Sequence, residues 1–132
     1  MLHLDDQEFE QLIGQALDEL PEKYTSAMDN VAIVYADIPT PAQRQELQLR
    51  CNETLYGLYQ GVPLPQRGSG YNLVLPDKIT LFKEPLLAGS VSPAALRANI
   101  KHTLWHELAH HFGLNHARIH ELERRAFTTK ER

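Results

Sequence analysis

The feature that most constrains this chain is a cluster of histidines near its C-terminus. Residues 106–116 read His-Glu-Leu-Ala-His-His-Phe-Gly-Leu-Asn-His, with a glycine between the second and the last histidine of the pattern H-E-x-x-H-x-x-G-x-x-H. Residues four apart on an α-helix lie about 40° apart around the axis and roughly 6 Å apart along it. His106 and His110 therefore project from one face of a helix and can reach the same metal ion.

The other residues of this motif have separate roles. Glu107 lies about 100° around the helix from His106, too far to be a third ligand but close enough to reach a metal-bound water. Gly113 can adopt the left-handed conformation that ends a helix, so the chain can turn sharply and His116 can return to the ion from another direction. The pattern predicts a zinc site with three ligands, His106, His110 and His116.

The helix that carries the motif is predicted to be buried. A short His-Glu-x-x-His sequence alone is equally compatible with a solvated polar face. Here, apolar side chains surround the ligand face: Leu104, Trp105, Leu108, Ala109 and Phe112. A buried helix does not carry histidines without partners for them, which favours a metal site. Ser92 as N-cap and Pro93 at the first helical position predict that this helix runs from about residue 93 to 112.

Polar residues near the motif are further candidates for side chains in or around the metal site. His102 is expected at the rim of the site or in contact with a ligand, and His111 is expected to point away from the metal and to pack elsewhere. A second helix is expected from about residue 117 to 127. If His116 does not bind the metal, the alternatives are the next polar side chains along the chain, His120, Glu121 and Glu123. Glu121 is the first alternative to test, because it could also orient a ligand histidine through a hydrogen bond.

The N-terminal half supplies scaffold elements. Apolar residues recur at helical spacing between residues 5 and 20, where Asp5 and Glu8 resemble a capping box. Residues 31–36 are a short apolar, β-branched run, typical of a buried strand. Thr40 followed by proline predicts a polar helix that ends near residue 52.

Two further segments precede the histidine helix. Residues 78–82 alternate as a strand does, and Pro76 and Pro85 on either side of it predict an edge position in the sheet. Residues 55–64 combine aromatic residues with glycines. They are either a strand with a bulge or a loop whose glycines allow another backbone to approach closely.

Composition narrows the class of protein. The 132 residues, 42% of them hydrophobic and 23% charged, predict one globular domain. A net charge of -4 argues against nucleic acid and anionic membranes as partners.

Cys51 is the only cysteine, so no internal disulfide can form and a reducing compartment is expected. The acidic N-terminus does not read as a signal peptide, and the chain has no apolar run of about 18 residues. The expected location is the cytoplasm, and the oligomeric state is open.

Several stretches together resemble a known family. They are residues 57–64 (Gly-Leu-Tyr-Gln-Gly-Val-Pro-Leu), 75–82 (Leu-Pro-Asp-Lys-Ile-Thr-Leu-Phe), 106–113, and His120-Glu121-Leu122. From about residue 30 to 123 the chain resembles the small bacterial zincin-like metallopeptidases. The resemblance implies an α+β fold, a single compact domain over residues 1–132. In it a small mixed β-sheet packs against a long active-site helix and two or three further helices. Members often carry Asp at the position of His116, which would also bind zinc.

The resemblance also implies a reaction. Zn²⁺ held by the three histidines would leave a position for water, and Glu107 would act as general base on that water as it attacks a peptide carbonyl. The expected partner is a peptide or protein substrate, which could add to an edge strand at residues 79–82 through main-chain hydrogen bonds. The chain departs from larger metzincins because its methionines, Met1 and Met28, both precede the site, so no methionine turn can lie beneath the metal.

Two other functions remain alternatives. One is a metal-dependent endoribonuclease, because an rRNA-processing family uses three histidines at the same spacing. Glu107 and the acidic net charge favour the peptidase, since an RNA-binding face is expected to be basic. The other is a non-catalytic domain that binds a metal or a partner and keeps the site for stability.

Overall fold

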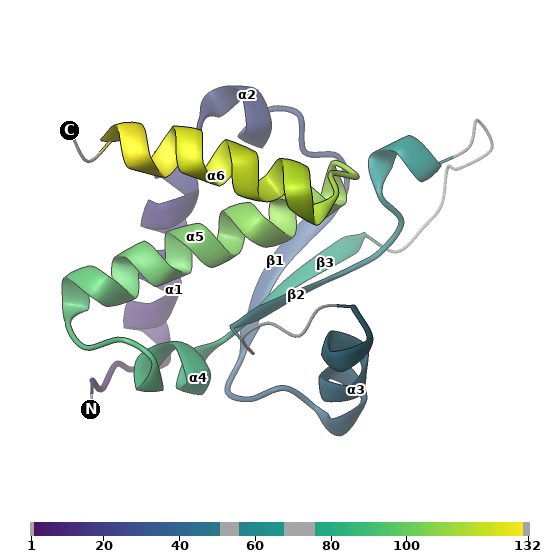
Figure 1. Cartoon of the computed structure of the whole chain (residues 1–132). Coiled ribbons are helices and arrows are strands. Elements are labelled where there is room, and N and C mark those ends of the chain that lie inside the picture. The colour runs from purple at the N-terminus through teal and green to yellow at the C-terminus, as the bar shows by residue number, and fades with distance from the viewer. Residues whose placement is uncertain (1, 51–55, 68–75, 131–132) are drawn as a thin grey trace.

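The computed structural model describes residues 2–50, 56–67 and 76–130, and the side chains of residues 46–50, 116 and 125–130 are not described (Figure 1). Cys51 therefore lies outside the described residues. The elements in chain order are α1 (Asp6–Glu19), α2 (Glu22–Thr25), β1 (Val31–Ala36), α3 (Pro41–Arg50), β2 (Gly57–Gln60), the 3₁₀ turn η1 (Leu64–Gln66), β3 (Asp77–Phe82), α4 (Lys83–Ala88), α5 (Pro93–His111) and α6 (His116–Lys130).

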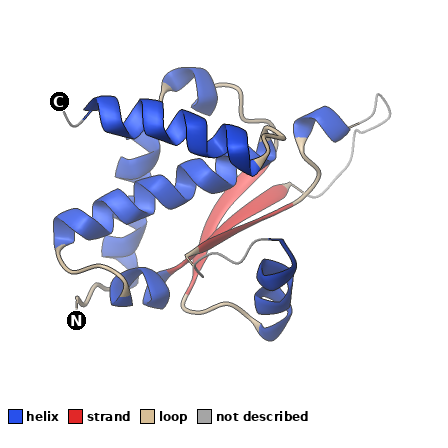
Figure 2. Cartoon of the chain, in the orientation of Figure 1, coloured by secondary structure: helices blue, strands red, loops and turns tan. Residues whose placement is uncertain are grey.

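The strands form a mixed sheet in the order β1-β3-β2, in which β1 is parallel and β2 antiparallel to β3 (Figure 2). The prediction that residues 78–82 form an edge strand was therefore wrong, because β3 is the central strand. Ile79 and Leu81 are buried in the main core, and Phe82 is buried in a smaller cluster with Leu58. The flanking prolines did not prevent this position, because both lie outside the strand and remove no hydrogen bond from it.

Strand β2 is an edge strand of the described sheet. The carbonyl of Tyr56 accepts a hydrogen bond from the Phe82 N–H at 2.9 Å. Main-chain groups alternate in direction along an antiparallel strand, so those of Gly57 and Tyr59 face away from β3. A Cβ atom at Gly57 would lie 2.6 Å from Cγ2 of Thr103, so this glycine allows α5 to approach the strand closely. Of the two alternatives expected for this segment, residues 57–60 adopt the strand, and the atom that approaches Gly57 closely belongs to the Thr103 side chain.

The helix starts follow the predicted caps. Glu8 N–H donates to the Asp5 carboxylate at 2.8 Å and Asp5 N–H to the Glu8 carboxylate at 3.0 Å, which completes a capping box on α1. The Thr40 hydroxyl caps α3 by accepting from Gln43 N–H at 3.1 Å. Ser92 caps α5 by accepting from Ala95 N–H at 3.1 Å. The elements not predicted, α2, η1 and α4, are too short to show a periodic pattern.

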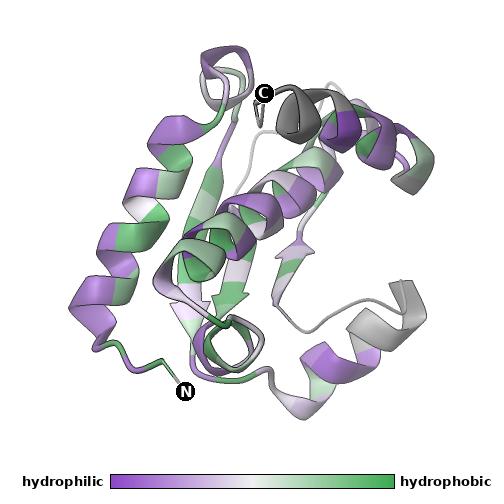
Figure 3. Ribbon diagram, turned by 60° about the vertical axis from the view of Figure 1, so that its left-hand side comes forward, coloured by the Kyte–Doolittle hydropathy of each residue, from purple (hydrophilic) through white to green (hydrophobic). Residues whose placement is uncertain are grey.

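The core lies between the sheet and two helices, α1 and α5. Helix α5 packs on β2 and β3, and α1 packs on α5. In Figure 3 the hydrophobic residues of α1 face the strands and its hydrophilic residues face outward. Fully buried core side chains of the two helices and the sheet include Phe9, Ile79, Leu81, Ile100, Leu104 and Leu108. In the part of the chain that the structure describes, no helix is long and apolar enough to cross a membrane.

Candidate metal centre

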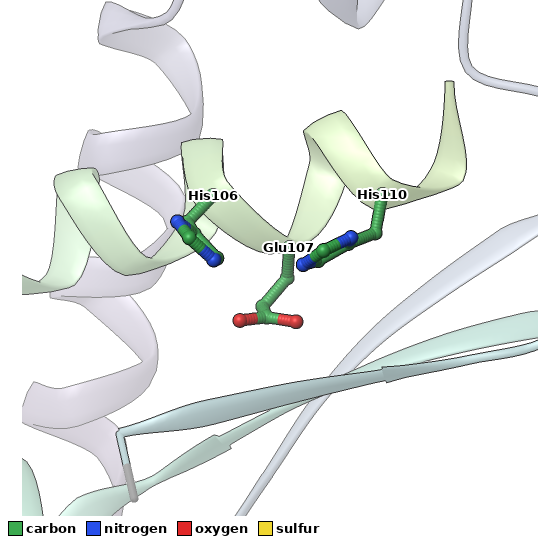
Figure 4. Close-up of side chains that lie close together, drawn as sticks. All are labelled: His106, Glu107 and His110. Atoms are coloured by element: carbon green, nitrogen blue, oxygen red, sulfur yellow. The ribbon is translucent and has the colours of Figure 1, made fainter. Parts of the chain in front are cut away.

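The second half of α5 brings together three side chains of the motif. His106 and Glu107 are buried, at 8% and 9% exposure, and His110 is half-buried. The two imidazole rings have centroids 5.1 Å apart. One potential ligand atom from each of His106, Glu107 and His110 lies within 4.8 Å of the other two. Figure 4 shows one nitrogen of each ring directed toward the space beside the Glu107 carboxylate.

The Glu107 carboxylate is held by the edge strand. Its Oε1 atom accepts a hydrogen bond from the Tyr59 main-chain N–H at 2.9 Å. This N–H is available because it faces away from β3, and Figure 4 shows the Glu107 side chain pointing toward the strands. The contact joins residues 48 positions apart and has no local signal in the sequence. It fixes the carboxylate between the helix and the strand, beside both histidines.

The end of α5 makes the turn that the motif predicts. Gly113 has φ +80°, in the left-handed region, and its N–H donates to the His110 carbonyl at 2.9 Å. The Asn115 side chain then caps α6 by accepting from Arg118 N–H at 2.8 Å. His116 is the first residue of α6, and its side chain lies outside the described part of the structure. Its role as third ligand therefore stays a prediction.

The acidic residue of α6 near the histidines is Glu123. Glu121, the first alternative for the third ligand, forms an ion pair with Arg118 at 2.9 Å. The Glu123 side chain is 9% exposed, contacts His102 Nε2, and lies 3.2 Å from His120 Nδ1 and 3.9 Å from His106 Nδ1. His102 is thus at the rim of the site, as predicted, with a side chain 57% exposed.

Glu123 is ionised at neutral pH. Its burial acts to raise the pKa of the carboxyl, but the interactions with His102 and His106 outweigh burial and lower the pKa to about 2. The sequence held one signal for this residue: His120 and Glu123 are three apart and so lie on one side of a helix.

A second buried polar cluster, formed by Tyr59, Arg67, Asp77 and His111, lies beside the site. The Asp77 carboxylate accepts from the Tyr59 hydroxyl, from Arg67 at 2.7 Å and from the His111 ring at 3.1 Å. His111 is fully buried and points to Asp77, which confirms that it packs away from the candidate metal ligands. The cluster joins β2, the segment after it, β3 and α5, and so supports the strand that holds Glu107.

The pKa values of His111 and Asp77 are both lowered in this cluster. Burial lowers the pKa of His111 and outweighs its interactions with Asp77, so the imidazole is neutral. Burial alone would raise the pKa of Asp77, but hydrogen bonds from Tyr59, Val62, Arg67 and His111 outweigh it and lower the pKa, so the carboxylate is ionised. With a proton on Nδ1, neutral His111 donates to Asp77, while Nε2 accepts from the Asp29 N–H at 3.4 Å.

A pocket opens next to the candidate ligands. Its volume is about 400 Å³, and it lies between the end of β2 and the turn after α5. The described residues that line it are Tyr59, Gly61, Pro63, Gln66, His110, Gly113 and Leu114. Because His110 forms part of its wall, a group bound in the pocket would lie against the metal centre.

Comparison with known proteins identifies the family. The sequence matches the family described as zincin-like metallopeptidase over residues 28–126. This is most of the chain, and the protein belongs to the zincin-like metallopeptidase family. The solved structure of a conserved hypothetical protein from T. thermophilus is similar, with a TM-score of 0.53 and 20% sequence identity over 83% of this chain and 94% of that chain. At this identity the similarity concerns the fold alone. A search of curated proteins found no match.

The donor set fits the divalent metal that this family implies. Two imidazoles converge on one side of a buried helix with the Glu107 carboxylate beside them, and imidazole nitrogen is a preferred ligand of zinc. The family match confirms the α+β zincin-like fold, and it extends over the region of resemblance, residues 30 to 123.

Proposed function

We propose that this protein is a zinc-dependent peptidase that hydrolyses peptide bonds. The observation that carries the proposal is the position of Glu107, whose carboxylate lies beside His106 and His110 and is held by the Tyr59 N–H of the edge strand. A metal site kept for stability alone has no need of a carboxylate fixed beside the ligands. The zincin-like family supports the same chemistry.

The reaction assigns a role to each side chain. His106 and His110 would hold the ion, with His116 as the predicted third ligand. When bound, the zinc ion supplies Lewis acidity toward a carbonyl oxygen and toward water. Glu107 accepts the proton of the attacking water and then transfers it to the leaving amine. The hydrogen bond from Tyr59 keeps the carboxylate in place during both transfers.

The substrate would lie along β2 rather than β3. The strand at residues 79–82 cannot receive a peptide, because β1 and β2 pair with both of its edges. The main-chain groups of Gly57 and Tyr59 face away from β3, and of these the Tyr59 N–H is already bonded to Glu107. An extended peptide that pairs with the remaining groups of this edge would place its carbonyl near the general base. The pocket beside His110 would then receive the side chain of a residue next to the bond that is cleaved.

The test compares wild type with Glu107→Gln, with Glu84→Gln as a control because Glu84 is exposed on α4. Zinc content and the cleavage of a fluorogenic peptide library are measured for each protein, with RNA as a counter-substrate. We expect about one zinc per chain in all three proteins. Loss of the general base should lower the cleavage rate by roughly 100-fold to 10,000-fold in Glu107→Gln only.

Two results would contradict the proposal. Cleavage of RNA by wild type, with none of peptides, would favour the endoribonuclease alternative. Zinc binding without hydrolysis, together with unfolding on chelation, would favour the non-catalytic domain.

Zinc content of His116→Ala tests the third ligand: full zinc in this variant would place that ligand elsewhere.

A further inference from the structure

Glu123 lies on the Nδ1 side of the His106 ring. Its Oε2 atom lies 3.9 Å from His106 Nδ1. Figure 4 shows that one ring nitrogen of His106 points toward Glu107 and His110 while the other points away from them. Because Nδ1 is the nitrogen that faces Glu123, the nitrogen on the metal side is Nε2. Glu123 therefore lies on the side of the His106 ring opposite to the candidate metal position.

This position separates Glu123 from the potential metal ligands on α5. Among the described side chains, the group whose ligand atoms lie within 4.8 Å of one another comprises His106, Glu107 and His110, and Glu123 is not part of it. Its carboxylate also contacts His102 and His120, one from each of the two helices that meet here. These contacts hold the buried carboxylate between α5 and α6.

We propose that Glu123 is a positioning residue for the metal centre: it accepts a hydrogen bond from His106 Nδ1–H and so directs Nε2 to the metal. A neutral imidazole carries one N–H, and a proton held on Nδ1 leaves the lone pair of Nε2 available for coordination. Hydrogen bonds lie at roughly 2.7–3.2 Å, so the carboxylate must move by about 1 Å to form this bond. Rotation of the Glu123 side chain can supply that movement.

The inference rests on the metal site of the proposed function but not on peptidase activity. Its test therefore measures zinc affinity, by competition with a chromophoric chelator, and the position of the imidazole protons, by long-range ¹H–¹⁵N spectra of histidine-labelled protein. The proteins are wild type, Glu123→Gln, Glu123→Ala and the surface control Glu84→Ala. Failure to cleave peptides would contradict the proposed function, but zinc affinity and the position of the imidazole protons would still test this inference.

The expected results separate positioning from a purely structural role. Loss of such a carboxylate partner typically weakens metal affinity by about 10–100-fold, so Glu123→Ala should fall in this range. Glu123→Gln keeps a neutral acceptor of the same shape and should lose less, and it covers the case in which Glu123→Ala does not fold. In zinc-loaded wild type, the His106 proton should reside on Nδ1.

Three results would overturn the inference. One is zinc affinity within twofold of wild type in both Glu123 variants, even if metal-free stability falls, since the contact would then only join the two helices. Another is a His106 proton on Nε2 in zinc-loaded wild type. A third is a second zinc equivalent in wild type that both Glu123 variants lose, because Glu123 would then be a ligand.

Discussion

At the scale of single residues, Gly113 shows how the motif depends on backbone conformation. Its φ of +80° lies in the left-handed region, and a Cβ atom there would be 2.6 Å from Pro65 Cγ. We predict that Gly113→Ala lowers the free energy of unfolding by about 1–3 kcal/mol, because alanine is strained in this conformation. Urea denaturation of the metal-free protein measures the change without any contribution from zinc.

Gly14 provides the matched control. It lies exposed in α1, and a Cβ atom there would meet nothing within 4 Å. Gly14→Ala should therefore raise the free energy of unfolding by about 0.5–1 kcal/mol, since alanine is the better helix former. If the two substitutions changed stability in the same direction, strain at Gly113 would not be the cause.

At the scale of elements, the contact between α5 and β2 brings Glu107 to the Tyr59 N–H. Gly57 and Thr103 meet at this contact, where a Cβ atom on the glycine would lie 2.6 Å from Thr103 Cγ2. We predict that Gly57→Ala destabilises the protein by about 1–3 kcal/mol, as overpacking does. Chemical denaturation measures the loss of stability.

A double-mutant cycle identifies the atom responsible. Thr103→Ser removes the methyl group that a Cβ at Gly57 would strike, so Gly57→Ala should cost less in this background. The recovery should be partial, because the same Cβ would also lie 3.3 Å from the Thr80 carbonyl. Additive single effects would show that the helix and the strand do not meet at this pair.

The arrangement of these elements was only partly predictable. Caps and periodicity located α1, α3 and α5, because these signals depend on neighbours along the chain. The position of β3 in the sheet did not follow from its flanking prolines. Strand order depends on which surfaces the helices bury, and here β3 is covered on both faces.

At the scale of the whole molecule, the buried cluster around Asp77 should make stability depend on pH. Neutral His111 has a lowered pKa and ionised Asp77 also has a lowered pKa, so the unfolded chain binds more protons than the folded chain. Stability from His111 is fully present above its unfolded pKa of about 6.5 and is lost as pH falls below that value. Stability from Asp77 is lost in the same way below about 3.9.

Urea denaturation of the metal-free protein between pH 8 and pH 5 tests the His111 contribution. We expect the free energy of unfolding to fall across this range in wild type, and to fall less steeply in His111→Gln, which cannot gain the proton. Equal pH dependence in the two proteins would show that His111 titrates alike in the folded and unfolded states.

The sequence by itself determined the local part of this centre. Helix geometry places His106 and His110 on one face with Glu107 beside them, and a glycine at position 113 ends the helix, because these relations depend only on spacing along the chain. The tertiary structure alone decided what surrounds them. Tyr59 holds Glu107, Glu123 lies behind His106, and β2 borders the site. These partners come from distant segments, and long-range packing rather than local conformation brings them together.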